Sequence, residues 1–131
     1  MIKLNNIKNI LIISDTHQRL YNELHNEIKK QISNADLVIH CGDITSENVI
    51  IGIKKNANQS IIVHGNSDPK EIRESLPNKK TFQINDITFG VIHPYWGGPP
   101  PIDYELILNH FKNIKPQYIL FGHTHDSHIE V

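Results

Sequence analysis

The sequence predicts an α/β fold built around a parallel sheet. Three short apolar runs rich in β-branched residues, at residues 7–14, 36–40 and 60–64, are typical of buried strands. Two amphipathic stretches, residues 18–32 and 46–55, separate them. This alternation of strands and helices with short connections predicts a parallel sheet covered by helices.

The two helices are predicted from apolar residues that recur on one face. The spacing is about one helical turn in both stretches. The residues are Leu20, Leu24, Ile28 and Ile32 in the first, and Val49, Ile50 and Ile53 in the second.

The second half of the chain has a different pattern. Residues 79–84 and 87–92 flank Asn85-Asp86, which predicts a two-residue β-hairpin. Residues 94–101 (PYWGGPPP) are too rich in Pro and Gly for a helix or strand. A short helix follows at residues 103–111, with Asp103 as its N-cap, and a final strand at residues 118–121.

Composition indicates one soluble domain. The chain has 131 residues, 38% of them hydrophobic and 21% charged, and its formal net charge is -1. No global basic field points to nucleic acid. Cys41 is the one cysteine, so no internal disulfide can form. Because no apolar run suits a signal peptide or a membrane span, we expect a cytoplasmic protein with no membrane partner.

Side chains that bind metals follow the predicted strands. In an open α/β sheet, ligands bind beyond the carboxyl ends of the strands. The chain has 9 histidines, and histidine is the commonest metal ligand. The clusters after the strands are Asp15-Thr16-His17, Gly42-Asp43, Gly65-Asn66-Ser67-Asp68, His93 and Gly122-His123-Thr124-His125.

The spacing within two clusters suits metal binding. In Asp15-x-His17 and His123-x-His125, the i, i+2 spacing places both side chains on one side of an extended backbone. Glycine before a ligand lets the backbone turn sharply and approach a site closely. Carboxylate, imidazole and amide ligands together suit Mn, Fe, Zn or Ni.

Each cluster alone has an ordinary structural interpretation. Asp-x-His or Gly-Asp after a strand is usually a turn, and Gly-Asn before Ser-Asp is usually an Asx-turn or a helix cap. His93 could equally be a loop histidine with satisfied hydrogen bonds. The conjunction of five such signals at the same kind of position favours a metal site.

In these five clusters the sequence resembles the calcineurin-like metallophosphoesterases, and among them the small prokaryotic phosphodiesterases of the YfcE type. The pattern of that family is D-x-H, G-D, G-N-x-D, a single His and G-H-x-H, and every element occurs here in order between Asp15 and His125. The resemblance implies a two-sheet αββα sandwich and a binuclear metal site.

The resemblance also implies a ligand set. One metal would be held by Asp15, His17 and His125, a second by Asn66, His93 and His123, and Asp43 would bridge them. A hydroxide between the ions would attack a small organic phosphodiester. Mn is the metal that we expect most, with Ni, Zn or Fe as alternatives. The expected catalytic residues are Asp43, Asn66 and His93.

Three further residues are candidate substrate contacts, namely His64, Ser67 and Trp96. Many relatives have His directly after the Asn, where it assists the leaving group, whereas this chain has Ser67. Serine cannot replace an imidazole acid, which argues against fast hydrolysis of esters with poor leaving groups. His64 could contact a substrate phosphate. Tyr95 and Trp96 could stack on an aromatic group or form a hydrophobic lid.

Other candidates have supporting roles or none. His40 matches an H-x-G-D pattern in which His supports the ligands. Asp68 could orient a ligand or cap a helix, and both interpretations stay open. Cys41 is expected to be a small buried residue. The remaining histidines, His25, His110 and His128, have no assigned role.

The C-terminal part departs from the family pattern. Relatives usually continue past G-H-x-H with a Pro and further strands, whereas here Asp126-Ser127 and one strand-like segment follow. We therefore expect either that the second sheet is reduced or that the chain is shortened. Exposed strand edges would then favour a homo-oligomer.

Two other functions remain as alternatives. Nucleases of the Mre11 type share the motif set, but the near-neutral charge argues against tracking a polyanion. A non-catalytic scaffold, like the retromer subunit of this fold, would typically have lost metal ligands, whereas all seven expected positions are present.

Overall fold

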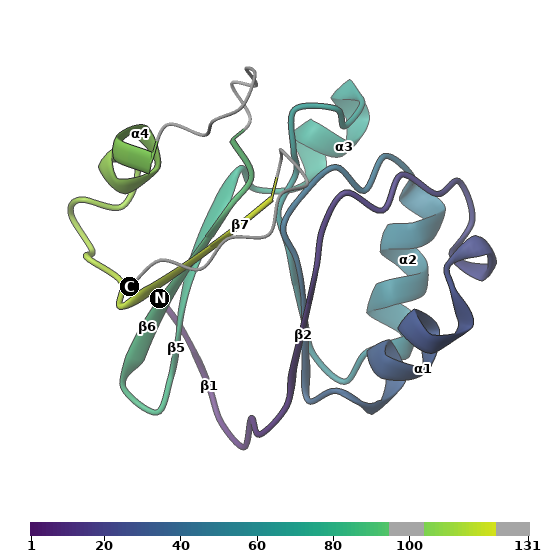
Figure 1. Cartoon of the computed structure of the whole chain (residues 1–131), viewed down its shortest axis with the longest axis horizontal. Helices are drawn as coiled ribbons and strands as arrows, with labels where there is room; N and C mark the ends of the chain where they lie inside the picture. The colour runs from purple at the N-terminus through teal and green to yellow at the C-terminus, as the bar shows by residue number, and fades with distance from the viewer. Residues whose placement is uncertain (95–103, 123–131) are drawn as a thin grey trace.

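The computed structural model describes residues 1–94 and 104–122 and has two sheets that face each other (Figure 1). The first sheet has the order β2-β3-β4 and is entirely parallel. Its strands are β2 (Ile10–Ile13), β3 (Leu37–His40) and β4 (Ser60–Ile62). The parallel sheet predicted from the first half of the sequence is confirmed, with strands shorter than expected.

The second sheet has four strands in the order β1-β5-β6-β7. Strands β5 (Lys79–Ile84) and β6 (Ile87–Ile92) form the predicted hairpin, with Asn85 and Asp86 both at positive φ in the turn. Strand β7 (Tyr118–Phe121) has the predicted bounds and pairs parallel to β6. Strand β1 (Ile2–Leu4), which the sequence analysis did not predict, pairs parallel to β5.

Helices cover the outer face of each sheet (Figure 1). On the first sheet lie α1 (Asn26–Asn34), α2 (Glu47–Asn56) and the unpredicted α3 (Lys70–Ser75). On the second sheet lies α4 (Tyr104–Asn109). The expected αββα sandwich is confirmed. The expected reduction of the second sheet concerns residues 123–131, which lie outside the described residues.

Apolar layers hold these parts together, because the sheets pack against each other and helices pack on their outer faces. One layer lies between the two sheets. Its buried residues are Leu37, Ile39, Cys41, Ile61, Val63, Phe82, Ile84 and Val91. A second layer joins the first sheet to α1, α2 and α3, and a third joins α4 to the second sheet.

The prediction of one helix over residues 18–32 is wrong. A 3₁₀ turn (Tyr21–Glu23) and α1 replace it, and Leu24 between them is extended. The ring of His25 accepts the Glu27 N–H at 3.1 Å and so caps α1. Leu20 is 46% exposed, so the four-residue apolar spacing did not begin on the buried face.

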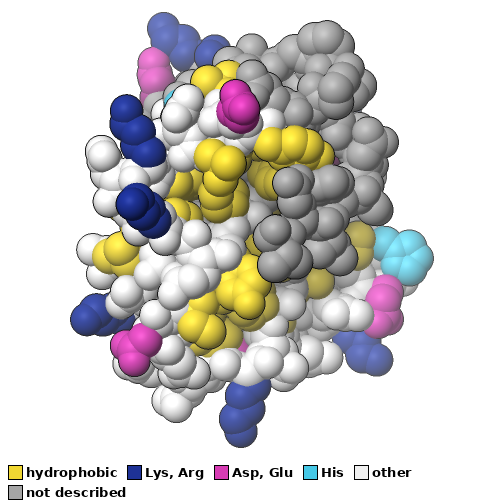
Figure 2. Space-filling view, turned by 60° about the vertical axis from the view of Figure 1, so that its left-hand side comes forward, with side chains coloured by type: hydrophobic (Ala, Val, Ile, Leu, Met, Phe, Trp, Pro, Cys, Tyr) yellow, Lys and Arg dark blue, Asp and Glu magenta, His cyan; other side chains and the backbone are white. Residues whose placement is uncertain are grey.

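The helix predicted at residues 103–111 is shorter, and its expected N-cap Asp103 lies outside the described residues, as does most of the Pro- and Gly-rich stretch. Figure 2 shows the side of the molecule that carries α4, with hydrophobic side chains at the surface in several groups. In the described part of the chain, no helix is long and apolar enough to cross a membrane.

Candidate metal centre

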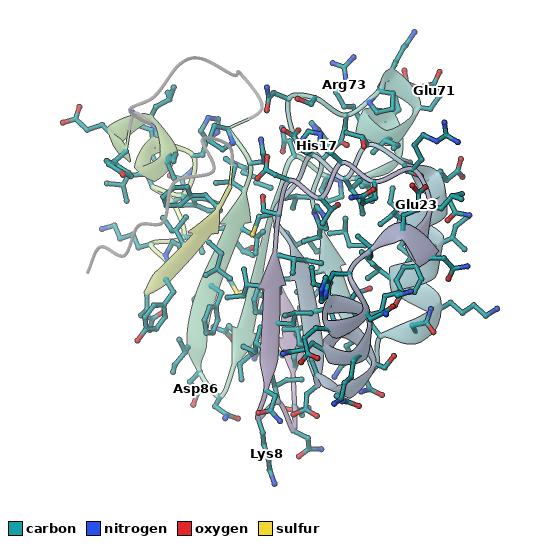
Figure 3. The ribbon with its side chains drawn as sticks, turned by 45° about the vertical axis from the view of Figure 1, so that its right-hand side comes forward. Lys8, His17, Glu23, Glu71, Arg73 and Asp86 are labelled. Atoms are coloured by element: carbon teal, nitrogen blue, oxygen red, sulfur yellow. The ribbon has the colours of Figure 1, made fainter. Side chains whose placement is uncertain are left out.

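The candidate ligands within the described residues follow strands β2, β3, β4 and β6, which end on the same side of the sandwich. Strands β2, β3 and β4 run parallel, and β6 and β7 run parallel in the facing sheet. His17 lies at this end of the molecule, as do Glu71 and Arg73 of α3, whereas Lys8 and Asp86 lie at the opposite end (Figure 3). This arrangement places loops from both sheets around one site.

Three predicted ligands from three loops meet at this site, two of them buried and the third, Asn66, exposed. His93 Nε2 lies 2.8 Å from Asn66 Oδ1 and 3.3 Å from Asp43 Oδ2. The side chain of His93 is 0% exposed and that of Asp43 is 4% exposed. These three residues are separated by up to fifty positions in the sequence, so the fold alone brings them together.

The hydrogen bond of His93 Nδ1 shows that Nε2 is the ring nitrogen that faces the site. His93 Nδ1 lies 2.9 Å from the carbonyl oxygen of Cys41. A carbonyl can only accept, so the hydrogen-bond network assigns the proton to Nδ1. The other ring nitrogen, Nε2, then faces two oxygen atoms. Three electron donors directed at one point fit a cation, and this donor set suits a divalent metal.

A second group of possible ligands lies beside the first. One ligand atom each from Asp15, His17 and Asp43 lies within 4.8 Å of the others, and Nε2 of His17 is 4.0 Å from Asp15 Oδ1. Asp15 and His17 both have positive φ, 54° and 51°. Non-glycine residues rarely adopt this conformation, and it is concentrated at functional sites.

Asp43 belongs to both groups. Burial acts to raise the pKa of its carboxyl, but hydrogen bonds from the His93 ring and the Ser67 N–H outweigh it and hold the pKa below its ordinary value. The Ser67 N–H donates to Asp43 Oδ1 at 2.7 Å. The carboxyl of Asp43 therefore stays ionised near neutral pH.

Glycines allow the loops to approach this closely. Gly42 has φ +107°, and a Cβ there would lie 2.5 Å from His93 Cβ and 2.7 Å from its Cγ. A Cβ at Gly65 would overlap the carboxylate of Asp43, and one at Gly122 would overlap the hydroxyl of Ser14. Each glycine that the sequence places before a presumed ligand therefore has a steric reason to be glycine.

His40 lies under the loop of Asp15 and His17. Its Nδ1 accepts the Gly42 N–H at 3.1 Å, and its Nε2 is 3.1 Å from Thr16 Oγ1. Burial, together with a smaller effect of the nearby His93, lowers the pKa of His40 to about 3. The ring is therefore neutral, with its proton on Nε2 and directed at Thr16. His40 thus ties the first ligand loop to the second.

The other predicted residues fall in different places. Ser67 is exposed beside Asn66, and His64 is buried with Nδ1 3.3 Å from the Gly65 carbonyl oxygen. Cys41 is buried as expected, and burial raises the pKa of its thiol to about 12. The remaining predicted site residues lie outside the described residues: Trp96, His123 and His125.

Two neighbours of the first ligands were missed by the sequence analysis. The hydroxyl of Ser14 donates to Asp15 Oδ2, and Thr16 contacts His40 as described above. Both are direct neighbours of a presumed ligand, and this position was the signal available in the sequence. Their side chains position the loop that carries Asp15 and His17.

Comparison with known proteins identifies the family. Residues 9–131 match the model of the calcineurin-like phosphoesterase superfamily domain. The chain belongs to this superfamily. It is also 37% identical over 122 residues to the Probable metallophosphoesterase MJ0623 of Methanocaldococcus jannaschii. That match covers 91% of this chain but only 59% of the relative, so the chain spans little more than half of the length of that protein.

Solved structures share the fold. The Thermotoga maritima protein TM1076 is 35% identical, with a TM-score of 0.74 over 95% of this chain and 78% of that one. Vacuolar Protein Sorting 29 (Vps29) of Cryptosporidium parvum has a TM-score of 0.76 at 18% identity, over 96% and 70%. The phosphoesterase Yfce of E. coli has 0.51 at 19%, over 73% and 64%. The two matches at lower identity show the fold alone.

Proposed function

We propose that this calcineurin-like domain is a divalent-metal-dependent phosphodiesterase that hydrolyses small organic phosphodiesters. The observation that carries the proposal is the convergence of Asn66, Asp43 and His93 at distances of 2.8 and 3.3 Å, with His93 Nε2 turned toward two oxygens. Asp43 and His93 are buried, whereas Asn66 is exposed and so can face a substrate. The chemistry of this site matches that expected of the superfamily.

The proposed ligand set keeps the assignment made from the sequence. Asp15, His17 and Asp43 would hold one ion together with His125, and Asn66, Asp43 and His93 would hold the other together with His123. When bound, two divalent ions would stabilise charge on the phosphoryl oxygens and make a water molecule acidic enough to ionise near neutral pH. Mn is the ion that we propose, and Ni, Zn or Fe are the alternatives.

The residues of the chain contribute position and charge. The buried Asp43 carboxylate is held by the Ser67 N–H on one oxygen and faces the His93 ring with the other. Asn66 offers its amide oxygen from a loop that is exposed to substrate. The catalytic role that we propose for Asp43, Asn66 and His93 is therefore to fix the geometry of the centre.

The substrate preference that we propose follows from Ser67. No imidazole occupies this exposed position, so the chain lacks there the acid that would protonate a poor leaving group. Aryl and other activated diesters should therefore be cleaved faster than alkyl diesters. His64 and Ser67 remain the proposed contacts of the substrate in the described part of the chain.

The test is a panel of phosphomonoesters and phosphodiesters assayed with Mn²⁺, Ni²⁺, Zn²⁺ and Mg²⁺. We expect turnover of bis(p-nitrophenyl) phosphate with Mn²⁺, and its loss after chelation or in Asp43→Asn. Asp36→Asn is the matched control, because Asp36 accepts backbone hydrogen bonds at the opposite end of the first sheet. No turnover of any ester with any of the four ions would contradict the proposal.

Trp96 adds a separate hypothesis about specificity. Stacking by Trp96 would favour aromatic leaving groups or nucleotide-like substrates. Trp96→Ala should then lower the activity ratio of aryl to alkyl diesters. An unchanged ratio would leave Trp96 as part of a hydrophobic lid.

A nuclease is a weaker proposal. The lysines and arginines visible in Figure 2 lie around the edge of that face and form no single stripe there. A polyanion usually requires a basic groove. Degradation of single-stranded DNA with Mn²⁺ would favour the nuclease over the small-molecule phosphodiesterase.

A scaffold is the candidate from another class, since the fold is shared with Vps29. It would account for the fold without requiring turnover, and protein partners or a homo-oligomer would then be expected. Metal binding without hydrolysis of any ester in the panel would favour it. We propose a cytoplasmic location for either function.

A further inference from the structure

Asp68 connects two of the ligand loops, although it is not itself a proposed ligand. Its carboxylate is buried, and the residue is 3% exposed. Oδ2 accepts the Gly65 N–H at 2.7 Å and the Asp43 N–H at 3.1 Å, while Oδ1 accepts the Thr45 N–H at 2.6 Å. Three backbone donors from two loops therefore meet on one side chain.

The loop held in this way has an unfavourable backbone conformation. Gly42, Asp43 and Thr45 have φ of 107°, 57° and 61°. For a β-branched residue such as Thr45 this conformation is strained. Backbone N–H groups that converge in such a turn form a small anion-binding concavity, and the Asp68 carboxylate occupies it. Hydrogen bonds to a charged acceptor are the stronger kind and can offset the strain.

The alternative role left open by the sequence, a helix cap, does not match the geometry. The N-cap of α3 is Pro69, and it has no side-chain cap hydrogen bond. Both oxygens of Asp68 instead face the loop of residues 42–45 and the Gly65 N–H.

We propose that Asp68 is a positioning residue that keeps the loop of residues 42–45 in its strained conformation and so directs the Asp43 carboxylate at His93. The inference rests on the proposed function in one respect, because it takes Asp43 to be a metal ligand. The positioning of Asp43 itself can be tested without any metal. The three hydrogen bonds of Asp68 reach the backbone of Asp43, Thr45 and Gly65, so its effect on His93 passes through Asp43.

The first measurement uses metal-free protein and the ¹⁵N resonances of the His93 ring. In Asp68→Asn, an amide replaces one acceptor with a donor, so at least one of the three backbone hydrogen bonds is lost. We expect the His93 resonances to shift because Asp43 moves. Asp36→Asn is the matched control, since Asp36 accepts the N–H groups of Lys8 and Asn9 at 2.8 and 3.0 Å. Unchanged His93 resonances in a folded Asp68→Asn variant would overturn the inference.

The second measurement is Mn²⁺ binding by calorimetry. We expect Asp68→Asn to weaken the binding of at least one ion by roughly 10- to 100-fold, the usual effect of removing support from a ligand. Asp36→Asn should bind within about twofold of the unmodified protein, as expected for a change far from the site. Equal binding by Asp68→Asn and the unmodified protein, or equal losses in both variants, would count against positioning.

A rescue variant separates positioning from general stability. Thr45→Gly keeps the backbone N–H but removes the strain at φ 61°. Added to Asp68→Asn, it should recover part of the lost Mn²⁺ affinity, whereas a loss caused by general destabilisation would not be recovered. If the double variant binds no better than Asp68→Asn, strain in this loop is not what Asp68 offsets.

The unmodified protein provides a measurement that does not depend on a variant that folds. In its metal-free form, the amide hydrogens of Asp43, Thr45 and Gly65 should be protected from exchange and should open together. Exchange of the Thr45 amide at an unprotected rate would overturn the inference. If the unmodified protein binds no Mn²⁺, the proposed function fails, while the exchange and His93 measurements still test the positioning role.

Discussion

The Nδ1 atom of His93 lies 2.9 Å from the carbonyl oxygen of Cys41, two residues before Asp43 in the chain. This hydrogen bond joins the two sheets, because His93 follows β6 and Cys41 follows β3. It also determines which ring nitrogen faces Asn66 and Asp43. One contact thus contributes to the fold and sets the chemistry of the site.

Replacing His93 should therefore affect both metal binding and stability. In His93→Ala we expect Mn²⁺ affinity at one site to fall by at least roughly 10- to 100-fold, as for other lost supports of a metal. The free energy of unfolding should fall by about 1–3 kcal/mol, because the buried Cys41 carbonyl loses its partner. Calorimetry and urea denaturation measure the two effects.

His25→Ala is the control for this variant. His25 caps α1 from an exposed position, so its loss should cost about 0.5–2 kcal/mol of stability and leave Mn²⁺ binding unchanged. A similar loss of metal affinity in both variants would show that the effect of His93 is not specific to the site.

Gly42→Ala should disrupt the site by steric conflict. The new Cβ would lie within 2.8 Å of three atoms of His93, and the position has φ +107°. We expect a loss of at least about 1–3 kcal/mol in unfolding free energy and weaker Mn²⁺ binding. Gly90→Ala is the milder comparison, since it meets the Phe111 ring in the layer under α4 and should leave metal binding intact. Normal Mn²⁺ affinity in Gly42→Ala would contradict the close packing of His93.

The buried His40 should make the metal-free protein less stable in acid. Its pKa is about 3 in the folded protein, against an ordinary 6.5, chiefly because burial disfavours the charged ring. Between these pH values the unfolded chain binds more protons than the folded protein. The contribution of the neutral His40 ring to stability is therefore present above pH 6.5 and is lost as the pH falls toward 3. Between pH 6.5 and 4.5 we expect the free energy of unfolding to decrease by an amount on the order of 1–3 kcal/mol.

Urea denaturation of metal-free protein over this pH range measures the effect. In His40→Gln the free energy of unfolding should depend less steeply on pH, because the titrating imidazole is gone. His25→Gln should keep the dependence of the unmodified protein, since His25 is exposed. Parallel curves for all three proteins would refute the assignment to His40.

Ser67→His should broaden the range of leaving groups. Ser67 is exposed beside Asn66, and its backbone N–H rather than its side chain contacts Asp43. An imidazole there could act as a general acid, which typically contributes roughly 10²–10⁴-fold. We expect kcat for alkyl diesters to rise more than kcat for bis(p-nitrophenyl) phosphate. Equal changes for both substrates would argue against a shortage of acid at this position.

The sequence predicted those parts of the fold that local patterns determine. Strands β5, β6 and β7 were predicted with the observed bounds, because a turn of Asn85 and Asp86 and the Pro and Gly residues nearby mark their ends. The division of α1 from the 3₁₀ turn was missed, because it depends on a cap by His25 that apolar spacing does not reveal. Strand β1 was missed because its pairing with β5 is a long-range contact.

The candidate site, like the fold, was predicted only in the parts that local sequence patterns determine. Asp15, His17, Asp43, Asn66 and His93 were predicted as ligands from motifs at strand ends, and the fold brings them together. The sequence left two roles open for Asp68 and could not decide between them, since two of its three hydrogen bonds reach a loop 23 to 25 residues away. Motifs predict which residues meet, whereas the supports that position them depend on tertiary structure.

Calorimetric titration of chelator-treated protein with Mn²⁺, in parallel with Asp43→Asn, tests the central claim most directly. Two ions per chain should bind the unmodified protein at micromolar concentrations. Asp43→Asn should weaken both sites, because this carboxylate lies between the two groups of ligands. The absence of divalent binding at micromolar levels would contradict the metal centre, and normal binding by Asp43→Asn would contradict the shared role of Asp43.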